Sequence, residues 1–435
     1  MYREALQSAI RSTGSFRKYY AMLREADLWT PEQVRKVQIS LLRDMIGRAY
    51  KSVPYYRTLL NGLGIRPEDI RTADDLQHLP LMDKFTLRSE FQSLRSHSRF
   101  VPAVQAYTSG TSGTPVVILR GLDNIRFEHA SLRMHDRWAG LTQPIRRFSL
   151  VGRRVVPLER TFPPFWKYDP FERELAMSSH HLSAEHVDSY IQELRRFRPD
   201  ALRAYPSTAH VLAHHLLERG MTIPLKAVFT QSEQLSESQR RDIEKAFQTR
   251  VYDRYGNAER VAAFFQCGHG SYHEAPLYSI MEYLPVGQGL YEVVGTTVHN
   301  SVMPLIRYRT DDLVELPAND SCPCGRTLRV IEHLSGRLKD QLVMEDGTLT
   351  TVHTSSIVKG MTWLKESQVL QEAVDSIVFR VVPMPGATVP GHGQIIDRLI
   401  KVIGGRRSKF RIEVVDRIPR EQNGKLKAVK SLLRD

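Results

Sequence analysis

The sequence has no run of about 18 apolar residues, the length that a helix needs to cross a bilayer. No Gly-Lys-Ser or Gly-Lys-Thr occurs in it, so the P-loop signature of nucleotide triphosphatases is also absent. The chain contains no low-complexity tract and no evident internal repeat. Because its first residues, Met-Tyr-Arg-Glu-Ala, lack the apolar core of a secretory signal, we expect a cytoplasmic protein that does not span a membrane.

Acidic residues are outnumbered by basic ones. The chain carries 61 Lys and Arg residues against 48 Asp and Glu residues, and the net charge of +13 permits attraction to nucleotides, nucleic acid or a membrane surface. The basic residues are spread along the chain in short pairs such as Arg153-Arg154, and no nucleic-acid-binding motif accompanies them. We therefore expect no specific nucleic-acid partner and at most a transient membrane-surface contact, while an oligomer is left open.

Only three cysteines are present, too few for a disulfide framework in a chain of this size. Cys322-Pro-Cys324 resembles a metal knuckle, in which a turn points two thiolates at one ion, and Cys267 lies in a segment that also contains His269 and His273. We predict a structural Zn2+ site formed by the three cysteines and one histidine, with His273 preferred to His269. The alternative is two unrelated groups of reduced cysteines.

The hydrophobic pattern predicts a mixed α/β fold. A helix is expected to begin at Thr30, where Gln33 completes a capping box, and to end near Val53. Residues 99–330 alternate short apolar runs with helical segments, which indicates helices packed on β-sheets.

The length of the chain favours more than one core. We predict a large N-terminal domain at residues 1–335 and a small α+β domain at residues 336–435. In the small domain, strands are expected at residues 377–382 and 410–415, and a helix at residues 394–403.

Residues 107–115 read Tyr-Thr-Ser-Gly-Thr-Ser-Gly-Thr-Pro, a segment rich in hydroxyl groups and glycine. Glycine lets the backbone approach a ligand closely, and hydroxyl and exposed N–H groups can donate hydrogen bonds to phosphate oxygens. Composition alone would favour an ordinary loop, so the phosphate interpretation depends on the motifs that follow it. The predicted phosphate-binding residues are Thr108, Ser109, Gly110, Thr111, Ser112, Gly113 and Thr114.

Five motifs follow one another in a characteristic order. They are Thr108 to Pro115, Tyr255-Gly-Asn-Ala-Glu259, Tyr308-Arg-Thr-Asp-Asp312, Gly336-Arg337 and Asn423-Gly-Lys425. In this order they resemble the adenylate-forming, or acyl-AMP synthetase, superfamily, and within it the phenylacetate–CoA ligase-like branch that includes the CapK-like proteins of capsular polysaccharide biosynthesis. The resemblance covers nearly the whole chain. It implies a large adenylation domain with a small, mobile C-terminal lid domain.

The resemblance implies an ATP or AMP site between these motifs. The loop of residues 108–114 would hold the phosphates, Tyr255 would lie against adenine, and Asp312 would accept hydrogen bonds from the ribose hydroxyls. The implied nucleotide-binding residues, besides the loop, are Ser232, Glu233, Tyr255, Gly256, Asn257 and Asp312.

The resemblance also implies catalytic residues. Glu259 would position Mg2+, and Arg337 would contact ribose or phosphate from the domain junction. Lys425 would reach in from the C-terminal domain and bridge the substrate carboxylate and the α-phosphate, where charge develops in the transition state. Lys339 stands where relatives have a hinge residue.

Three positions depart from the superfamily pattern. Ala258 stands where relatives usually carry threonine, Asp311 replaces a glycine, and Val116 replaces a lysine that many relatives place after the phosphate loop. The first change removes a hydroxyl donor and the second adds a negative charge beside Asp312. Both favour the alternative of a nucleotide-binding pseudoenzyme without turnover.

We therefore predict an AMP-forming ligase that activates a small carboxylic acid with ATP, releases pyrophosphate and transfers the acyl group to a thiol, such as CoA or a carrier, or to an amine. The resemblance is equally compatible with biosynthesis of a surface polysaccharide or a secondary metabolite and with aromatic catabolism. The identity of the acid stays open. A zinc-stabilised basic protein that binds nucleic acid is a further alternative, supported only by net charge.

Overall fold

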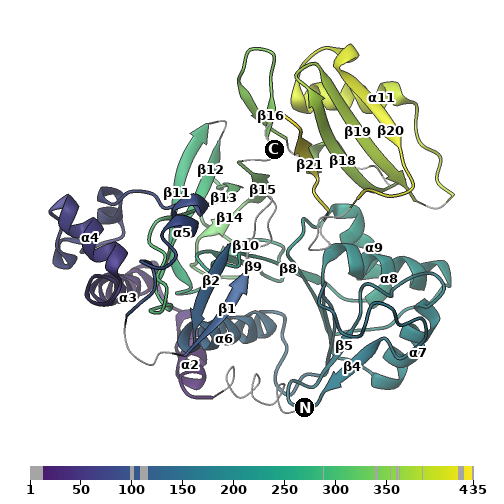
Figure 1. Cartoon of the computed structure of the whole chain (residues 1–435). Helices are drawn as coiled ribbons and strands as arrows, with labels where there is room; N and C mark the ends of the chain where they lie inside the picture. The colour runs from purple at the N-terminus through teal and green to yellow at the C-terminus, as the bar shows by residue number, and fades with distance from the viewer. Residues whose placement is uncertain are drawn as a thin grey trace.

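The structure of the protein is a computed structural model. The residues it describes are 13–97, 102–107, 116–287, 289–338, 341–352, 354–358, 361, 363–384, 386–419 and 426–433. They form a large α/β unit and a smaller C-terminal α+β unit, which confirms the predicted fold class (Figure 1). None of the helices in these ranges has the length and apolar character needed to cross a membrane.

The N-terminal region is helical. Its elements are α2 (Phe16–Ala26), α3 (Pro31–Ser52), α4 (Pro54–Leu63), η1 (Pro67–Asp69), η2 (Asp74–His78) and α5 (Lys84–Ser89). The predicted capping box is present, since the Thr30 hydroxyl accepts from the Gln33 backbone N–H at 3.3 Å and the Gln33 side chain accepts from the Thr30 N–H at 2.8 Å. Val53 then adopts an extended conformation before Pro54, which separates α3 from α4.

A nine-stranded sheet forms the centre of the large unit, in the order β14-β10-β9-β8-β7-β6-β3-β5-β4. Its strands are β3 (Arg147–Leu150), β4 (Trp166–Asp169), β5 (Glu174–Met177), β6 (Ala201–Ala204), β7 (Ala227–Gln231), β8 (Val251–Gly256), β9 (Ala263–Gln266), β10 (Tyr272–Glu274) and β14 (Val330–Ile331). The five strands from β5 to β8 are parallel, and the outer strands pair antiparallel.

Helices cover both faces of this sheet. They are α6 (Leu122–Trp138), α7 (Val187–Phe197), α8 (Pro206–Glu218) and α9 (Glu237–Phe247). Neighbouring residues of a strand point to opposite faces. Accordingly, Val228 of β7 packs into the core with α7, α8 and α9, whereas the ring of Phe229 lies 5.2 Å from that of His135 on α6.

Two antiparallel groups of strands complete the large unit. A four-stranded sheet consists of β11 (Ser279–Gly287), β12 (Leu290–Thr297), β13 (Tyr308–Glu315) and β15 (His333–Arg337), while β1 (Ala103–Tyr107) and β2 (Val117–Gly121) form a two-stranded ribbon. Gly295 of β12 lies so close to the Val261 backbone that an added Cβ would overlap the Val261 carbonyl oxygen. Only glycine therefore allows this sheet to pack against the segment that follows Glu259.

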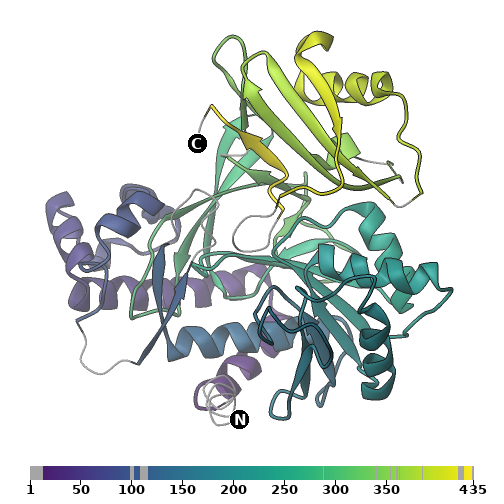
Figure 2. The same ribbon diagram turned by 45° about the vertical axis from the view of Figure 1, so that its right-hand side comes forward.

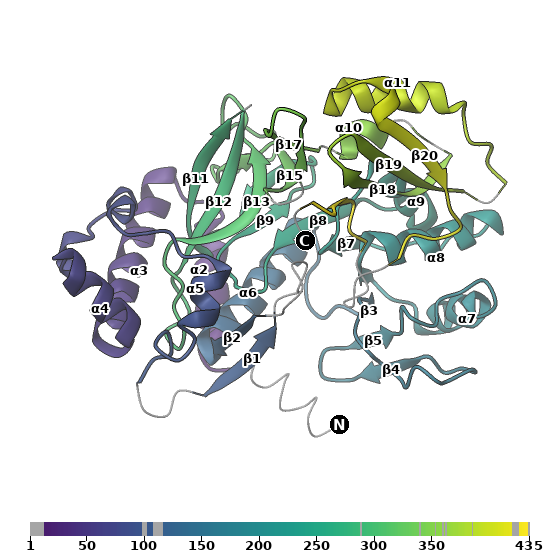
Figure 3. The same cartoon turned by 45° about the horizontal axis from the view of Figure 1, so that its top comes forward.

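The C-terminal unit has a sheet of its own, in the order β20-β19-β18-β21. Its elements are β16 (Gln341–Val343), β17 (Leu349–Thr351), α10 (Thr354–Val358), β18 (Leu364–Ala373), β19 (Ser376–Pro383), α11 (His392–Ile403), η3 (Arg407–Lys409), β20 (Phe410–Val414) and β21 (Val429–Ser431). The expected strands and helix correspond to β19, β20 and α11. The views in Figures 2 and 3 show this unit over the α9 side of the large unit, and the Thr354 hydroxyl donates to the Gln234 side chain at 3.2 Å.

Candidate active site

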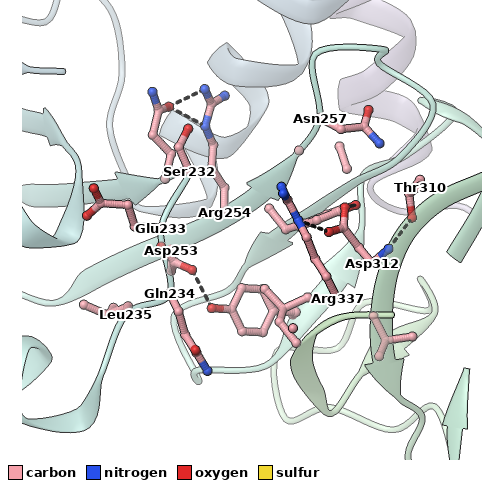
Figure 4. Close-up of a pocket in the computed structure, with 18 of the residues that line it drawn as sticks. Ser232, Glu233, Gln234, Leu235, Asp253, Arg254, Asn257, Thr310, Asp312 and Arg337 are labelled. Carbon is pink, nitrogen blue, oxygen red and sulfur yellow. Dashed lines mark hydrogen bonds and ion pairs between the residues drawn. The ribbon is translucent and has the colours of Figure 1, made fainter. Parts of the chain in front are cut away.

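A cavity of about 1290 Å³ lies where the C-terminal unit meets the large unit. Its wall includes residues at and beyond the carboxyl ends of the parallel strands β7 and β8, together with parts of β13 and β15 (Figure 4). Residues 426–428 of the C-terminal unit also line it. In open α/β sheets, ligands bind at the carboxyl ends of the strands. The predicted residues that line this cavity are Ser232, Glu233, Tyr255, Gly256, Asn257, Glu259, Asp312 and Arg337.

Two predicted parts of the site lie outside the described residues. These are the phosphate loop, from Thr108 to Thr114, and Lys425. Lys339 also lies outside them. Tyr107 and Leu426, which adjoin the two segments in the sequence, both line the cavity.

Asp312 is held by residues from two other strands. Its Oδ2 accepts from the Tyr255 hydroxyl at 2.6 Å, and its Oδ1 accepts from Arg337 Nε at 3.0 Å. Asp312 and Arg337 are direct partners in the β13–β15 pairing (Figure 4). Burial, and then the nearby Asp312 carboxylate, raise the pKa of Tyr255 well above its usual value. Tyr255 is therefore a neutral donor, and the carboxylate is fixed in place without a ligand.

Asp311 has a backbone φ of 61°, in the left-handed region that favours glycine. The Leu338 N–H donates to its carbonyl oxygen at 2.6 Å. Aspartate tolerates this conformation better than most other side chains do. The replacement of the superfamily glycine by Asp311 is therefore compatible with the local backbone.

The segment after β7 is tied to helix α8. Ser232 has a φ of 69°, and Glu233 Oε2 accepts from the Ser207 backbone N–H at 3.1 Å, in the first turn of α8. This contact orients the segment that the family resemblance assigns to the purine.

The segment after β8 carries the remaining motif residues. Glu259 is 7% exposed, and its Oε1 accepts from the Tyr308 hydroxyl at 2.9 Å. Asn257 Oδ1 accepts from the Val261 N–H at 3.1 Å, whereas its buried Nδ2 has no partner within the described ranges. A buried amide donor without a partner is costly, so Nδ2 is suited to donate to a ligand. Ala258 belongs to the same segment and is partly buried.

One group of cavity residues was not predicted from the sequence. Arg120, Glu128, Arg254 and Arg260 line the wall on the α6 side. Two of these residues could have been predicted from their place beside a motif, because Arg254 directly precedes Tyr255 and Arg260 directly follows Glu259. Arg120 and Glu128, however, lie more than a hundred residues earlier, and only the fold brings the four together.

The four predicted metal ligands meet in one place. One ligand atom from each of Cys267, His273, Cys322 and Cys324 lies within 4.8 Å of the others. The Sγ atoms of Cys267 and Cys322 are 3.7 Å apart, and Cys324 Sγ is 3.3 Å from His273 Nε2. A tetrahedral Zn2+ ion with bonds of about 2.3 Å to sulfur and about 2.0 Å to nitrogen places its ligand atoms roughly 3.5–3.8 Å apart. The arrangement fits such an ion.

The histidine of this group is oriented by the main chain. His273 Nδ1 lies 3.2 Å from the Leu328 carbonyl oxygen, to which it can only donate, and this leaves Nε2 as the ligand atom. His269 stands outside the group, with its backbone N–H 3.4 Å from Cys267 Sγ. Next to the group, Arg326 lies 4.2 Å over the Trp138 ring and pairs with Asp27, which follows α2, at 2.8 Å. The group therefore joins β9 and β10 to the segment that contacts α2 and α6.

Comparison with known proteins shows similarity in sequence and in fold. Residues 342–432 match the family described as the CapK C-terminal domain. The chain is 25% identical over 382 residues to protein CapK of Staphylococcus aureus, covering 86% of this chain and 84% of that protein. It is also 25% identical over 329 residues to a phenylacetate-coenzyme A ligase of Thermus thermophilus, covering 72% of each.

A solved structure of 2-hydroxyisobutyryl-CoA ligase in the postadenylation state has the same fold, with a TM-score of 0.70 and 18% identity over 93% of this chain and 91% of that one. The match of residues 342–432 and the similarity to these relatives support the predicted resemblance to adenylate-forming ligases, and within them to the phenylacetate–CoA ligase-like and CapK-like branch.

Proposed function

We propose that this protein joins a carboxylic acid to AMP and then passes the acyl group to a thiol or an amine. A carboxylate oxygen attacks the α-phosphorus of ATP, the bond from that phosphorus to pyrophosphate breaks, and an acyl-adenylate forms. The thiol or amine then attacks the acyl carbon, loses its proton and expels AMP. The observation that carries this proposal is the meeting of Tyr255, Asp312 and Arg337 with buried Glu259 in one cavity that the C-terminal unit helps to line.

The nucleotide would lie along β8 and β13. A carboxylate has about four lone-pair positions, and Tyr255 and Arg337 occupy two of them on Asp312, which leaves two for the ribose hydroxyls. Ser232, Glu233 and Gly256 line the same cavity and would surround the purine beside Tyr255. The Asn257 amide would donate to the nucleotide or the acid.

Glu259 would hold Mg2+. Its Oε1 accepts from Tyr308, and a carboxylate fixed at one oxygen can offer the other to a cation. Burial, followed by the Glu259 carboxylate, raises the pKa of Tyr308, so this partner stays a neutral donor. Bound Mg2+ would neutralise charge on the phosphate oxygens.

Transition-state stabilisation is assigned to Lys425 and the loop of residues 108–114 on the basis of their motifs. Lys425 would bridge the acid carboxylate and the α-phosphate, and the loop would hold the β- and γ-phosphates. Leu426 lines the cavity directly after Lys425, which supports this assignment.

For the acceptor we propose CoA. The curated relatives include several named phenylacetate-coenzyme A ligase, which favours CoA over a carrier or an amine. The chain is similar to protein CapK, and the resemblance to the CapK-like proteins of capsular polysaccharide biosynthesis favours a role in making a surface polysaccharide or a secondary metabolite. The four-ligand Cys and His group would hold one structural Zn2+ ion, because four protein ligands leave no open position for catalysis.

A second candidate is a binding-only protein, and Ala258 favours it because the superfamily threonine hydroxyl is missing there. The deciding experiment is acid-dependent exchange of pyrophosphate into ATP, screened over aryl, fatty, amino and sugar acids. Exchange in the wild type that falls at least about a hundredfold in Glu259→Gln supports the ligase. Glu345→Gln, at an exposed position, is the matched control. Nucleotide binding without exchange for any acid would support the binding-only protein.

A further inference from the structure

Three arginines surround one glutamate on the α6 wall of the cavity. Arg254 Nη1 lies 3.8 Å from Glu128 Oε1, and Arg260 Nε lies 3.7 Å from Glu128 Oε2. Arg120 lines the same wall from β2, and its Nη2 donates to the Ala258 carbonyl. We call these four residues the basic cluster.

The charges of the basic cluster do not balance. No second carboxylate in the described ranges forms an ion pair with Arg120, Arg254 or Arg260. The other polar contacts of Arg254 and Arg260 are to neutral groups, the Gln231 side chain and Asn124. Arg120 Nε is buried and has no hydrogen-bond partner among the described residues. Within the cluster, three positive charges are thus paired with one negative charge, and at least one buried donor is left for a ligand.

The electrostatics agree with this geometry. Burial, and then the charge of Arg260, lower the pKa of Arg120 to about 10 against the opposing effects of Glu128, Tyr278 and Glu259. Burial also opposes ionisation of Glu128, but Arg260 and Arg254 outweigh it and lower the pKa of Glu128. Glu128 is thus charged and still insufficient to neutralise the arginines. A bound anion would relieve their mutual repulsion.

The basic cluster lies apart from the residues proposed to bind the nucleoside. Arg254 and Tyr255 are neighbours in β8 and point to opposite faces. Tyr255 contacts Asp312, whereas Arg254 contacts Gln231 and Glu128. An anion on the cluster would therefore belong to the part of the ligand that extends toward α6.

We infer that the basic cluster binds a second acidic group of the substrate, so that the acid activated by this protein is a dianion, such as a dicarboxylic acid or a phosphorylated carboxylic acid. The inference rests on the proposed ligase function and specifies its substrate class. Guanidinium groups bind carboxylate and phosphate oxygens alike, often through two parallel hydrogen bonds. The carboxylate that reacts with ATP stays free of the cluster and lies toward Glu259.

Calorimetric titration of the full chain tests this inference, in the presence of Mg2+ and α,β-methylene-ATP. The probes are matched pairs that differ by one acidic group: succinate and butyrate, phthalate and benzoate, and 3-phosphoglycerate and glycerate. We expect at least one dianion to bind about tenfold more tightly than its partner, the usual effect of one charge-assisted hydrogen bond. Arg254→Gln should abolish the preference, and Arg254→Lys should retain part of it.

Controls separate the cluster from general charge effects. Arg196→Gln, at an exposed arginine paired with Glu193, should leave both affinities unchanged. Thermal denaturation checks that Arg254→Gln is folded, and Arg260→Gln replaces it if it is not.

Three results separate the possibilities. Equal affinities within every pair would overturn the inference. If Arg254→Gln binds the ATP analogue more weakly but still discriminates between the acids as the wild type does, the cluster binds ATP phosphates. That result would also overturn the inference. A dianion preference without pyrophosphate exchange for any acid would confirm the anion site but reject the ligase function.

Discussion

The Tyr255 hydroxyl donates a 2.6 Å hydrogen bond to Asp312, which lies 57 residues later in the chain. Tyr255 lies near the carboxyl end of β8 in the nine-stranded sheet, whereas Asp312 belongs to β13 in the four-stranded antiparallel sheet. The bond therefore joins two separate sheets at the wall of the cavity. With Arg337 on the other oxygen, Asp312 is oriented before any ligand binds, which would lower the entropic cost of the proposed contact with ribose.

We predict that Asp312→Asn raises the KM for ATP by at least about tenfold, because the change removes a charged acceptor for the ribose hydroxyls. Tyr255→Phe keeps the carboxylate and removes one neutral donor, and it should raise the same KM only about two- to tenfold. Pyrophosphate exchange at varied ATP concentration measures both effects. An unchanged KM in Asp312→Asn would reject the ribose assignment.

Lys425→Ala should lower the rate of adenylate formation by at least about a hundredfold and change ATP binding little, since the charge acts mainly in the transition state. Exchange kinetics and calorimetric ATP titration report the two quantities separately. Lys401→Ala, at an exposed position of α11, is the control and should behave as the wild type. A wild-type rate of pyrophosphate exchange in Lys425→Ala would contradict the role proposed for Lys425.

Protein purified without chelator should contain one Zn2+ ion per chain. Cys324→Ser should lose the ion and lower the unfolding temperature more than the rate per folded molecule, because metal binding contributes folding free energy. His269→Ala should keep the ion, since His269 lies outside the ligand group. Elemental analysis and thermal denaturation measure these outcomes, and a wild type without zinc would contradict the prediction.

Ala258→Thr should remain active and increase adenylate formation by about tenfold or more, provided that the new hydroxyl reaches the α-phosphate. A charge-assisted hydrogen bond contributes about 1.5–3 kcal/mol. Ala258→Val adds similar bulk without the hydroxyl and is the matched control. If both variants are inactive, Ala258 instead provides space for the substrate.

Stability should decrease below the ordinary pKa of histidine, because buried His299 resists protonation. Burial lowers its pKa to about 4 from 6.5, while its Nε2–H donates to the Leu277 carbonyl at 2.8 Å. The unfolded chain therefore binds this proton more readily, and the stabilisation present above pH 6.5 is lost as the pH falls toward 4. At pH 5 the loss from this group is about 2 kcal/mol.

Urea unfolding at pH 7.5 and pH 5 measures this loss. His299→Asn should show a smaller difference between the two pH values than the wild type. His180→Asn, at an exposed histidine, should preserve the wild-type difference. Equal pH dependence in His299→Asn and the wild type would contradict the prediction.

Local features of the fold were predictable because they depend on neighbouring residues. The capping box of Thr30 and Gln33 is one example, since it requires only two suitable residues three positions apart in the sequence. The order of strands in the central sheet was not predictable, because it depends on pairings such as β3 with both β5 and β6, which sequence patterns do not specify. Periodicity reveals a strand but not its partner.

The same distinction applies to the site. Motif order predicted Glu259, Asp312 and Arg337 as site residues, and all three line the cavity. The basic cluster was not predicted, because Glu128 lies on the polar side of a helical pattern, where a charged residue is usually solvated. The cluster is formed only in the fold, where β8 brings Arg254 against α6.

The ion pair between Asp27 and Arg326 spans 299 residues. A ribosome adds about 5–20 residues per second, so Arg326 is synthesised roughly 15 to 60 seconds after Asp27, which directly follows α2. During that time the early helices can dock on α6, but this ion pair and the contact of Thr327 with the Trp29 carbonyl cannot form. Completion of the N-terminal region is thereby coupled to synthesis of the Cys322 to Leu328 segment, and truncated chains are expected to expose the apolar side of α2 to chaperones and proteases.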